Sequence, residues 1–295
     1  MNPNKLTLSR EMRHDNVYPL SKVVDVKELT GFTPRKGLEK AIISNDKIVN
    51  FVAKGYGHLT TQQFFGTVEN KLQAAGLQYE TRSINRDDRS FAVDYILTDE
   101  RYLAVMKNGN GTKGIDYIKP MLRFVTSYDG SNSAMGFFGH FRQVCTNGLM
   151  AHKFDIGFKV KHRGNIVEVV MPEISNIFEK FMSNDYYSLH RKFEVLQERI
   201  IPNLKDFVKM TANDLKVFKY EASDKNPEPS LNAEIVLNII REEARQGGFP
   251  EPTYWHGYNA FNELLGTRLQ KTFDQSRRLD AKIFDKVYEL ATAAN

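Results

Sequence analysis

The sequence predicts an α+β fold in which a mostly antiparallel sheet with one packed helix is followed by a C-terminal helical region. Two observations support this class. Short segments with strand-like patterns, separated by turn signals, fill the chain up to residue 141. After Gly164 the apolar residues recur at helical spacing instead. Because strands and helices do not alternate regularly, a doubly wound parallel sheet is disfavoured.

The strand-rich part begins with a strand pair and one well-marked helix. Residues 38–57 indicate two short strands around an Asn-Asp turn. Thr60 and Gln63 then form a capping-box pattern, and apolar residues follow at helical spacing. Gly76 suits a C-terminal cap, so a helix is predicted over residues 60–76.

Further strands are predicted through residue 141. Residues 77–84 and 90–97 flank a turn-rich segment and indicate a hairpin. The strand pattern continues over three more segments, residues 101–108, 120–127 and 134–141.

The clearest alternation of apolar and basic residues runs over residues 156–163. One face of this strand would carry Ile156, Phe158 and Val160. The other face would carry three cations, which are Lys159, Lys161 and Arg163. These cations form either an ordinary solvated sheet face or a basic stripe that follows a phosphate backbone.

The second part of the chain is predicted to be helical. Pro172 suits the first turn of a helix, and Asn184 or Asp185 can cap the next one, which Pro202 interrupts. The predicted organisation is an N-terminal arm (1–35), a strand-rich core (36–165), a helical region (166–222), a linker (223–230) and C-terminal helices (231–295).

Composition limits the cellular setting. Hydrophobic residues make up 41% of the 295 residues, which is enough for a sizeable core. The chain opens without a signal-peptide pattern and contains no apolar run long enough to span a membrane, so we expect a cytoplasmic protein without membrane contact. The net charge of +5 permits an anionic partner such as nucleic acid.

The single cysteine, Cys145, allows three interpretations. It lies between His140 and His152, so a thiol nucleophile with a histidine base is one of them. A metal site that adds His162 is the second, although no Cys-x-x-Cys or His-x-x-x-His spacing occurs here. A buried structural thiol is the third, and the flanking apolar residues favour it.

Other motifs give little support for catalysis. Residues 108–114, NGNGTKG, lack the Gly-Lys-Ser/Thr order of a phosphate-binding loop. Asp129 lies among serines, but no Gly-x-Ser-x-Gly elbow is present. The sequence favours a protein that is not an enzyme and has no metal or cofactor. A hydrolase or nuclease that uses Asp129, His140 or His162 stays open as a weaker alternative.

Aromatic residues interleaved with cations are the remaining clue. Exposed aromatic rings beside cations would suit stacking of single-stranded bases. Alternatively, the rings are core and only the cations reach water. The candidate nucleic-acid-binding residues are Arg123, Arg142, Lys159, Lys161 and Arg163.

Three central motifs and one later segment resemble a known family over roughly residues 36–266. An Asp-Gly-Ser segment, a Val-Cys-x-Asn segment, a His-x-Gly-Asn segment and a Trp-x-x-x-Asn-Ala segment are all present. The chain thus resembles the prokaryotic and viral family called domain of unknown function 932, or phage/plasmid-like proteins. The matching residues, which we expect to be structural, are Asp129, Gly130, Ser131, Cys145, Asn147, His162, Gly164, Asn165, Trp255 and Asn259.

The resemblance implies a setting in phages, plasmids and their bacterial hosts, and it implies no reaction. The first hypothesis is therefore a non-enzymatic nucleic-acid-binding protein, such as a single-strand annealing or recombination accessory factor. Such a protein would favour single-stranded DNA and act as a homo-oligomer. The alternative is a phage-encoded protein that binds and inhibits a host defence enzyme.

Overall fold

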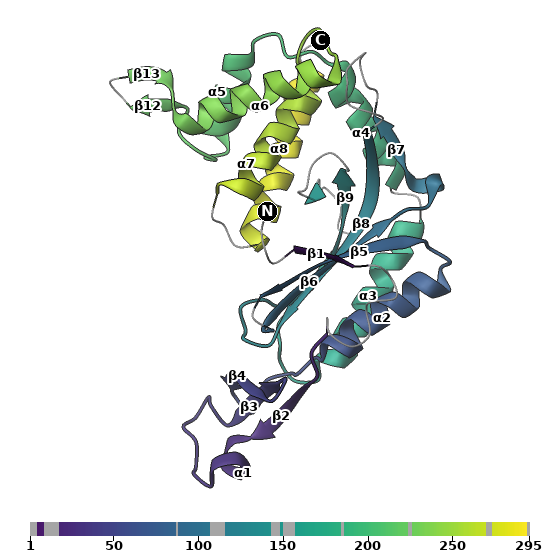
Figure 1. Cartoon of the computed structure of the whole chain (residues 1–295), viewed down its shortest axis with the longest axis vertical. Coiled ribbons are helices and arrows are strands. Elements are labelled where there is room, and N and C mark those ends of the chain that lie inside the picture. Colours follow the sequence, from purple (N-terminus) through teal and green to yellow (C-terminus); the bar gives the residue numbers. More distant parts are fainter. Residues whose placement is uncertain are drawn as a thin grey trace. The chain divides into compact units, whose positions relative to one another are not determined.

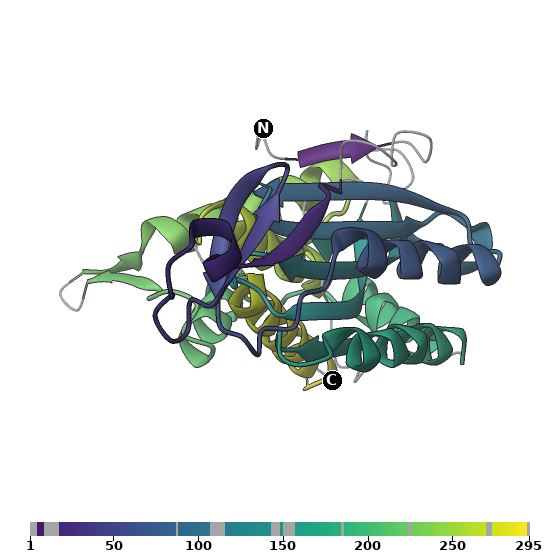
Figure 2. The same cartoon turned by 90° about the horizontal axis from the view of Figure 1, so that it is seen from below.

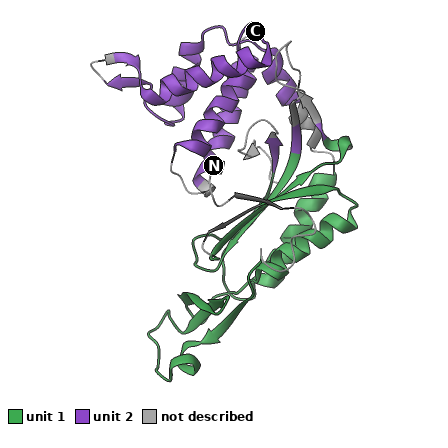
Figure 3. Ribbon diagram, viewed as in Figure 1, with its two compact units in different colours: residues 1–102, 120–138, 154–183 green, residues 103–119, 139–153, 184–295 purple. Residues whose placement is uncertain are grey.

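The computed structural model describes residues 5–8, 18–86, 88–106, 116–142, 148–149, 157–183, 186–223, 226–269 and 273–293. The chain forms two compact units, which Figure 3 shows in different colours. Unit 1 comprises residues 1–102, 120–138 and 154–183, and unit 2 comprises residues 103–119, 139–153 and 184–295. Two long strands, β8 (Asp116–Ser127) and β9 (Ala134–Arg142), contribute residues to both units.

Unit 1 contains a small antiparallel sheet near its N-terminal end. Its strands are β2 (Ser21–Asp25), β3 (Lys40–Ser44) and β4 (Lys47–Val52), in that order, and the short helix α1 (Val26–Thr30) follows β2. Asn45 and Asp46 join β3 to β4 with φ values of 46° and 61°. Two consecutive positive φ angles are what a tight two-residue hairpin requires, so the predicted Asn-Asp turn is confirmed.

The larger sheet of unit 1 is built on a hairpin. Strands β5 (Tyr79–Arg86) and β6 (Ser90–Leu97) pair in register from Tyr79 opposite Leu97 to Arg86 opposite Ser90, which confirms the predicted hairpin. Strand β6 pairs with β8, and β8 neighbours β9 (Figure 1). Strand β1 (Lys5–Leu8) pairs antiparallel with β5, and β11 (Gly157–Val160) pairs antiparallel with β9.

Two helices cover one face of this sheet. Figures 1 and 2 show α2 (Thr61–Ala74) and α3 (Ile166–Met182) on the same side of it. Phe64 of α2 meets Phe124 of β8 edge-on, with ring centroids 5.8 Å apart. Phe181 of α3 lies 5.5 Å from Phe138 of β9. These apolar contacts form the core of unit 1.

The start of α2 follows the predicted pattern closely. The Gln63 backbone N–H donates to the Thr60 hydroxyl at 3.1 Å, and the Thr60 N–H donates to the Gln63 side-chain oxygen at 3.4 Å. The capping box is therefore formed in both directions. Gly76 follows the helix with a φ of 64°, as its expected role in ending the helix requires.

The predicted start of α3 at Pro172 is wrong. The helix begins six residues earlier, at Ile166, and Pro172 lies inside it. Proline is unfavourable inside a helix because it lacks the backbone N–H that would donate to the carbonyl oxygen four residues earlier. The buried stripe of Ile166, Val170 and Ile174 offsets that loss by packing on one face of the helix. The residues before Pro172 are mostly β-branched, which is typical of strands, so the sequence pattern did not indicate a helix there.

Unit 2 is mainly helical. Phe193 lies at its core, with ring centroids 5.4 Å from Trp255 and 5.6 Å from Phe284. Two short strands also belong here. Strand β7 (Ala104–Met106) pairs with the start of β8, and β10 (Gly148–Leu149) pairs with the end of β9. The helices of this unit are α4 (Tyr186–Glu198), α5 (Leu204–Asp214), α6 (Leu231–Gly247), α7 (Tyr254–Thr267) and α8 (Phe273–Ala293).

Two segments of the predicted organisation contain strands. Most of the predicted linker, residues 223–230, is ordered, because β12 (Glu221–Ser223) pairs with β13 (Asn226–Pro229) and Ser230 caps α6. The predicted N-terminal arm supplies β2, which pairs with β3 of the predicted core. The predicted α+β class is confirmed, with antiparallel strands followed by helices. None of the described helices has the length and apolar character needed to cross a bilayer.

Candidate nucleic-acid interface

The basic segment after β9 alternates in exposure as its sequence predicts. Lys159, Lys161 and Arg163 are exposed, whereas Phe158 and Val160 are half-buried. His162 continues the alternation and is only 9% exposed. Ile156, expected on the apolar face, lies outside the described residues.

Phe158 anchors the basic segment to the core. Its ring lies 6.4 Å from Phe64 and 6.4 Å from Phe124, on the helix-covered face of the sheet. Because successive side chains of a strand point to opposite faces, Lys159 faces away from this apolar layer. Among the described strands, β11 pairs with β9 alone. Lys159 thus lies on a sheet edge, and Lys161 and Arg163 follow in the segment after it.

Beyond the strand, His162 is held by both ring nitrogens. Its Nδ1 lies 3.2 Å from the Gly57 carbonyl oxygen, and its Nε2 lies 3.3 Å from the Thr126 hydroxyl. A carbonyl can only accept, so Nδ1 carries the proton and Nε2 accepts from Thr126. Burial lowers the pKa of His162 below its ordinary value of 6.5, which keeps the ring neutral.

Tyr56 stacks on this histidine. The two rings are nearly parallel, with an interplanar angle of 4° and centroids 5.3 Å apart. The Tyr56 hydroxyl donates to the Ser127 carbonyl oxygen at 3.4 Å. Burial, helped by Asp129, raises the pKa of Tyr56 well above its ordinary value of 10, so the hydroxyl keeps its proton. Both rings are therefore fixed in orientation by hydrogen bonds and stacking.

Backbone contacts bring Tyr56 and His162 together. Tyr56 and Arg163 form an isolated antiparallel bridge, and the Gly164 N–H donates to the Gly55 carbonyl oxygen at 3.0 Å. A Cβ atom at Gly57 would lie 2.6 Å from the Gly164 carbonyl oxygen. Glycine is thus required at residue 57 for the two segments to meet.

An open pocket of about 400 Å³ lies where these segments meet. Its lining residues are Ala53, Gly55, Tyr56, His162 and Arg163. Two fixed rings and one exposed guanidinium thus share one concave surface, and they come from two segments about a hundred residues apart in the sequence. This surface can stack a flat ring and bind an anion beside it.

The Asp-Gly-Ser motif forms the turn between β8 and β9. The Ser131 N–H donates to the Asp129 carboxylate at 2.9 Å, and Gly130 has a φ of 76°. The Ser127 hydroxyl donates to the Asn132 carbonyl and accepts from the Asn132 N–H. These bonds close the turn, so Asp129 has a local structural role here.

Arg123 lies apart from the exposed cations. Its side chain is 8% exposed and forms a bidentate ion pair with Asp94 on the neighbouring strand. The buried ion pair with Asp94 accounts for the position of the Arg123 guanidinium, so Arg123 is not part of the candidate interface. Arg142 ends β9, but its side chain lies outside the described part of the chain.

The remaining residues of the family motifs lie in different parts of the fold. Gly164 has a φ of 56°, and Asn165 immediately precedes α3. Trp255 and Asn259 are both buried in α7 of unit 2. Cys145 and Asn147 lie outside the described residues, so the three interpretations of the cysteine stay predictions.

The residues of the weaker hydrolase alternative are placed as follows in the described part of the chain. No group of three His, Cys, Asp or Glu residues there is placed to hold a metal ion. Both nitrogens of His162 are engaged, and His140 is fully buried in the part of β9 that belongs to unit 2.

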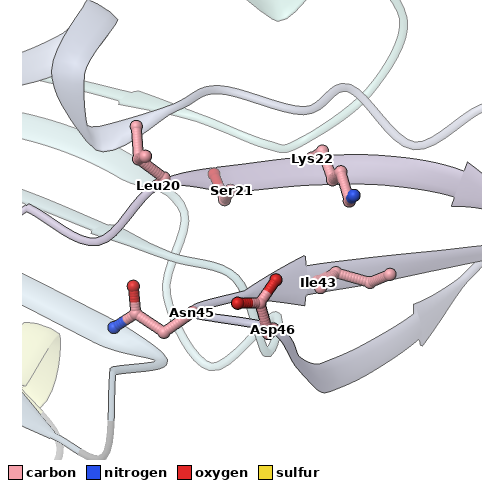
Figure 4. Close-up of a pocket in the computed structure, with 6 residues that line it drawn as sticks. All are labelled: Leu20, Ser21, Lys22, Ile43, Asn45 and Asp46. Atoms are coloured by element: carbon pink, nitrogen blue, oxygen red, sulfur yellow. The ribbon is translucent and has the colours of Figure 1, made fainter.

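A second hollow, of about 300 Å³, lies at the start of the small sheet (Figure 4). The Ser21 hydroxyl lines it and lies 3.1 Å from Nε2 of His58. The Nδ1 atom of His58 is buried and has no hydrogen-bond partner among the residues that the structure describes. A catalytic serine–histidine pair needs a third group that orients the imidazole, and the described residues supply none here. The hollow is lined by Leu20, Ser21, Lys22, Ile43, Asn45 and Asp46.

Tyr56 and Gly57 are the site residues that sequence reasoning missed. Both lie in the run Lys-Gly-Tyr-Gly-His, residues 54–58. The sequence pattern predicts a strand through residue 57, whereas β4 ends at Val52. An aromatic residue between two glycines is a local signal for close backbone approach. The partner, His162, lies too far along the chain for any local pattern to connect them.

The fold and the site together define an α+β protein with a basic sheet edge beside an aromatic-lined pocket. The family model described as Domain of unknown function (DUF932) matches residues 49–281, which is more than half of the chain. The chain belongs to this family, as the sequence motifs suggested. Searches of the curated proteins and of the solved structures found no match.

Proposed function

We propose that this protein binds single-stranded DNA without chemical reaction, as an annealing or recombination accessory factor of a phage or plasmid. The observation that supports this most strongly is the exposed row of Lys159, Lys161 and Arg163, which starts in the edge strand β11 and continues in the segment after it. The mobile-element setting follows from the family resemblance alone, and the cytoplasm of a bacterial host is part of this proposal.

The geometry of the row suits an extended phosphate backbone. Lys159 lies in β11, and Lys161 follows directly after the strand. The Arg163 N–H donates to the Lys161 carbonyl oxygen at 2.8 Å, so the chain turns there and brings Arg163 to the pocket beside Tyr56. Neighbouring cations of this kind neutralise phosphates and release counterions, which gives affinity without reading sequence. Bases on the far side of the backbone stay available for pairing, as annealing requires.

The direct test removes the row and keeps the fold. We expect the variant Lys159→Ala, Lys161→Ala, Arg163→Ala to raise the apparent Kd for a labelled single-stranded oligonucleotide by roughly tenfold or more at low salt. Fluorescence anisotropy measures this. A matched control removes three exposed lysines of unit 2, Lys205, Lys219 and Lys282, and lowers the net charge equally. Equal weakening in both variants would reduce the effect to net charge and contradict the proposed row.

A second candidate function, inhibition of a host defence protein by binding, has a different observation in its favour. Large apolar side chains are exposed in and around the small sheet, with Phe32 78% exposed and Phe51 45% exposed. Exposed apolar side chains of this size are a common feature of protein-binding surfaces. Under this function, Phe32→Asp with Phe51→Asp abolishes capture of one specific host protein and leaves oligonucleotide binding intact.

A further inference from the structure

The pocket beside the basic row has features that the row alone does not need. A phosphate-binding strip requires exposed cations, yet here two aromatic rings are stacked and locked at its end. His162 is fixed by Gly57 and Thr126, and Tyr56 is fixed by Ser127. Rings that are fixed before a ligand arrives lose little entropy when one stacks on them.

The lining of the pocket selects one chemical class. Flat aromatic ligands stack on the faces or edges of Tyr and His rings, and nucleobases are the flat rings that accompany phosphate. Arg163 lines the same pocket and is exposed, so its guanidinium is placed for the phosphate next to such a base. A volume of about 400 Å³ falls in the range of small-ligand sites.

We infer that the pocket of Tyr56, His162 and Arg163 binds one unpaired nucleobase together with its adjoining phosphate. The inference rests on the proposed function, since the base would belong to the strand whose backbone follows Lys159 and Lys161. One base held in this way would fix the register of the strand on the protein. Other bases would stay free to pair.

The test compares two ligands that share a backbone. Oligothymidylate and an abasic phosphodiester of the same length carry the same phosphates, but only the first has bases. We expect wild-type protein to bind oligothymidylate about five- to a hundredfold more tightly, the range typical of one stacked base. The salt dependence of the two affinities should be equal, because the phosphate contacts are the same.

Substitutions at Tyr56 locate the effect. Tyr56→Ala should remove most of the preference for oligothymidylate, whereas Tyr56→Phe keeps the ring and should retain the preference. Circular dichroism and thermal unfolding check that both variants fold. If Tyr56→Ala fails to fold, the comparison of the two ligands on wild-type protein still decides whether a base is bound.

The outcomes separate this inference from the proposed function. Equal, salt-sensitive binding of both ligands would overturn the base pocket and leave the backbone row standing. If neither ligand binds at low salt, the proposed function fails, and titration with a free nucleoside monophosphate then decides the pocket. Binding that depends on Tyr56 would support a nucleobase site that serves a free nucleotide, and the absence of binding would overturn the inference.

Discussion

At the scale of single residues, the two glycines that flank Tyr56 have very different surroundings. A Cβ at Gly57 would lie within 3.0 Å of three backbone atoms of Arg163 and Gly164, whereas a Cβ at Gly55 would have no atom within 4 Å. Backbone atoms cannot move aside as the end of a flexible side chain can. Gly57 is therefore the residue that allows the pocket to form.

Substitution of these glycines tests that role. We expect Gly57→Ala to lower the free energy of unfolding by about 1–3 kcal/mol, because the segments must separate to admit the methyl group. Gly55→Ala is the matched control and should change stability by less than about 0.5 kcal/mol. Urea unfolding followed by circular dichroism measures both. Equal effects of the two substitutions would mean that the close approach at Gly57 is absent.

Two buried histidines give the stability a definite pH dependence. Burial lowers the pKa values of His58 and His162 below 6.5, and His162 lowers that of His58 further. Just below pH 6.5, the two histidines therefore bind protons in the unfolded chain but stay neutral in the folded chain. The stabilisation is complete above about pH 6.5 and is lost as the pH falls below that value.

This dependence can be measured directly. We expect the free energy of unfolding to fall between about pH 7 and about pH 5, a window above the ordinary titration of carboxylates. His58→Gln keeps a polar group near Ser21 and removes one titrating site, so its loss of stability over this window should be smaller. Stability that stays constant over this pH window in the wild-type protein would contradict neutral, buried histidines.

At the scale of elements, Asp94 links three neighbouring strands of the unit 1 sheet. It lies opposite Arg82 of β5 and opposite Arg123 of β8, and all three side chains are buried. Burial lowers the pKa of Arg82, while Asp94 opposes that effect. One carboxylate thus stabilises two buried cations.

Removal of that charge should be costly. We expect Asp94→Asn to destabilise the protein by about 3–5 kcal/mol, since it removes a buried negative charge that lies beside two buried guanidinium groups. Asp46→Asn, in an exposed turn, loses the same charge and should be nearly neutral. Thermal unfolding of the two variants decides this, and a small shift for Asp94→Asn would show that water reaches the arginines.

Much of the element pattern could be predicted from local sequence because local chemistry determines it. The capping box of Thr60 and Gln63, the Asn45-Asp46 turn and the alternation through Lys159 all depend on residues a few positions apart. The start of α3 could not be predicted, since packing of Ile166 and Val170 outweighs the unfavourable effect of Pro172 inside a helix. The pairing of β12 with β13 was also hidden, because proline and charged residues indicate a loop.

The cations of the candidate site could be predicted from the sequence, but the stacked rings beside them could not. The cations of the basic row follow from strand periodicity, which one segment contains by itself. Arg123 is also a cation among aromatic residues, like those of the basic row. Only the register of β6 against β8 shows that it pairs with Asp94. The stacking of Tyr56 on His162 arises from a backbone bridge between distant segments, for which the sequence has no local sign.

At the scale of the whole molecule, the net charge of +5 and the family membership both agree with an anionic partner but select none. The distribution of charge is more informative than its sum. Three cations occur at alternate positions on one edge strand and the segment after it, beside a pocket with aromatic walls. The central claim is therefore that this particular row neutralises successive phosphates of a single strand.

The salt dependence of single-strand binding tests that claim most directly. For single strands, the logarithm of the binding constant falls with the logarithm of salt concentration with a slope of about −0.7 for each neutralised phosphate. We expect the variant that lacks Lys159, Lys161 and Arg163 to have a slope shallower by about 2, whereas the control that lacks Lys205, Lys219 and Lys282 keeps the wild-type slope. A slope that is the same in all three proteins would mean that the row contacts no phosphates, and would contradict the proposed function.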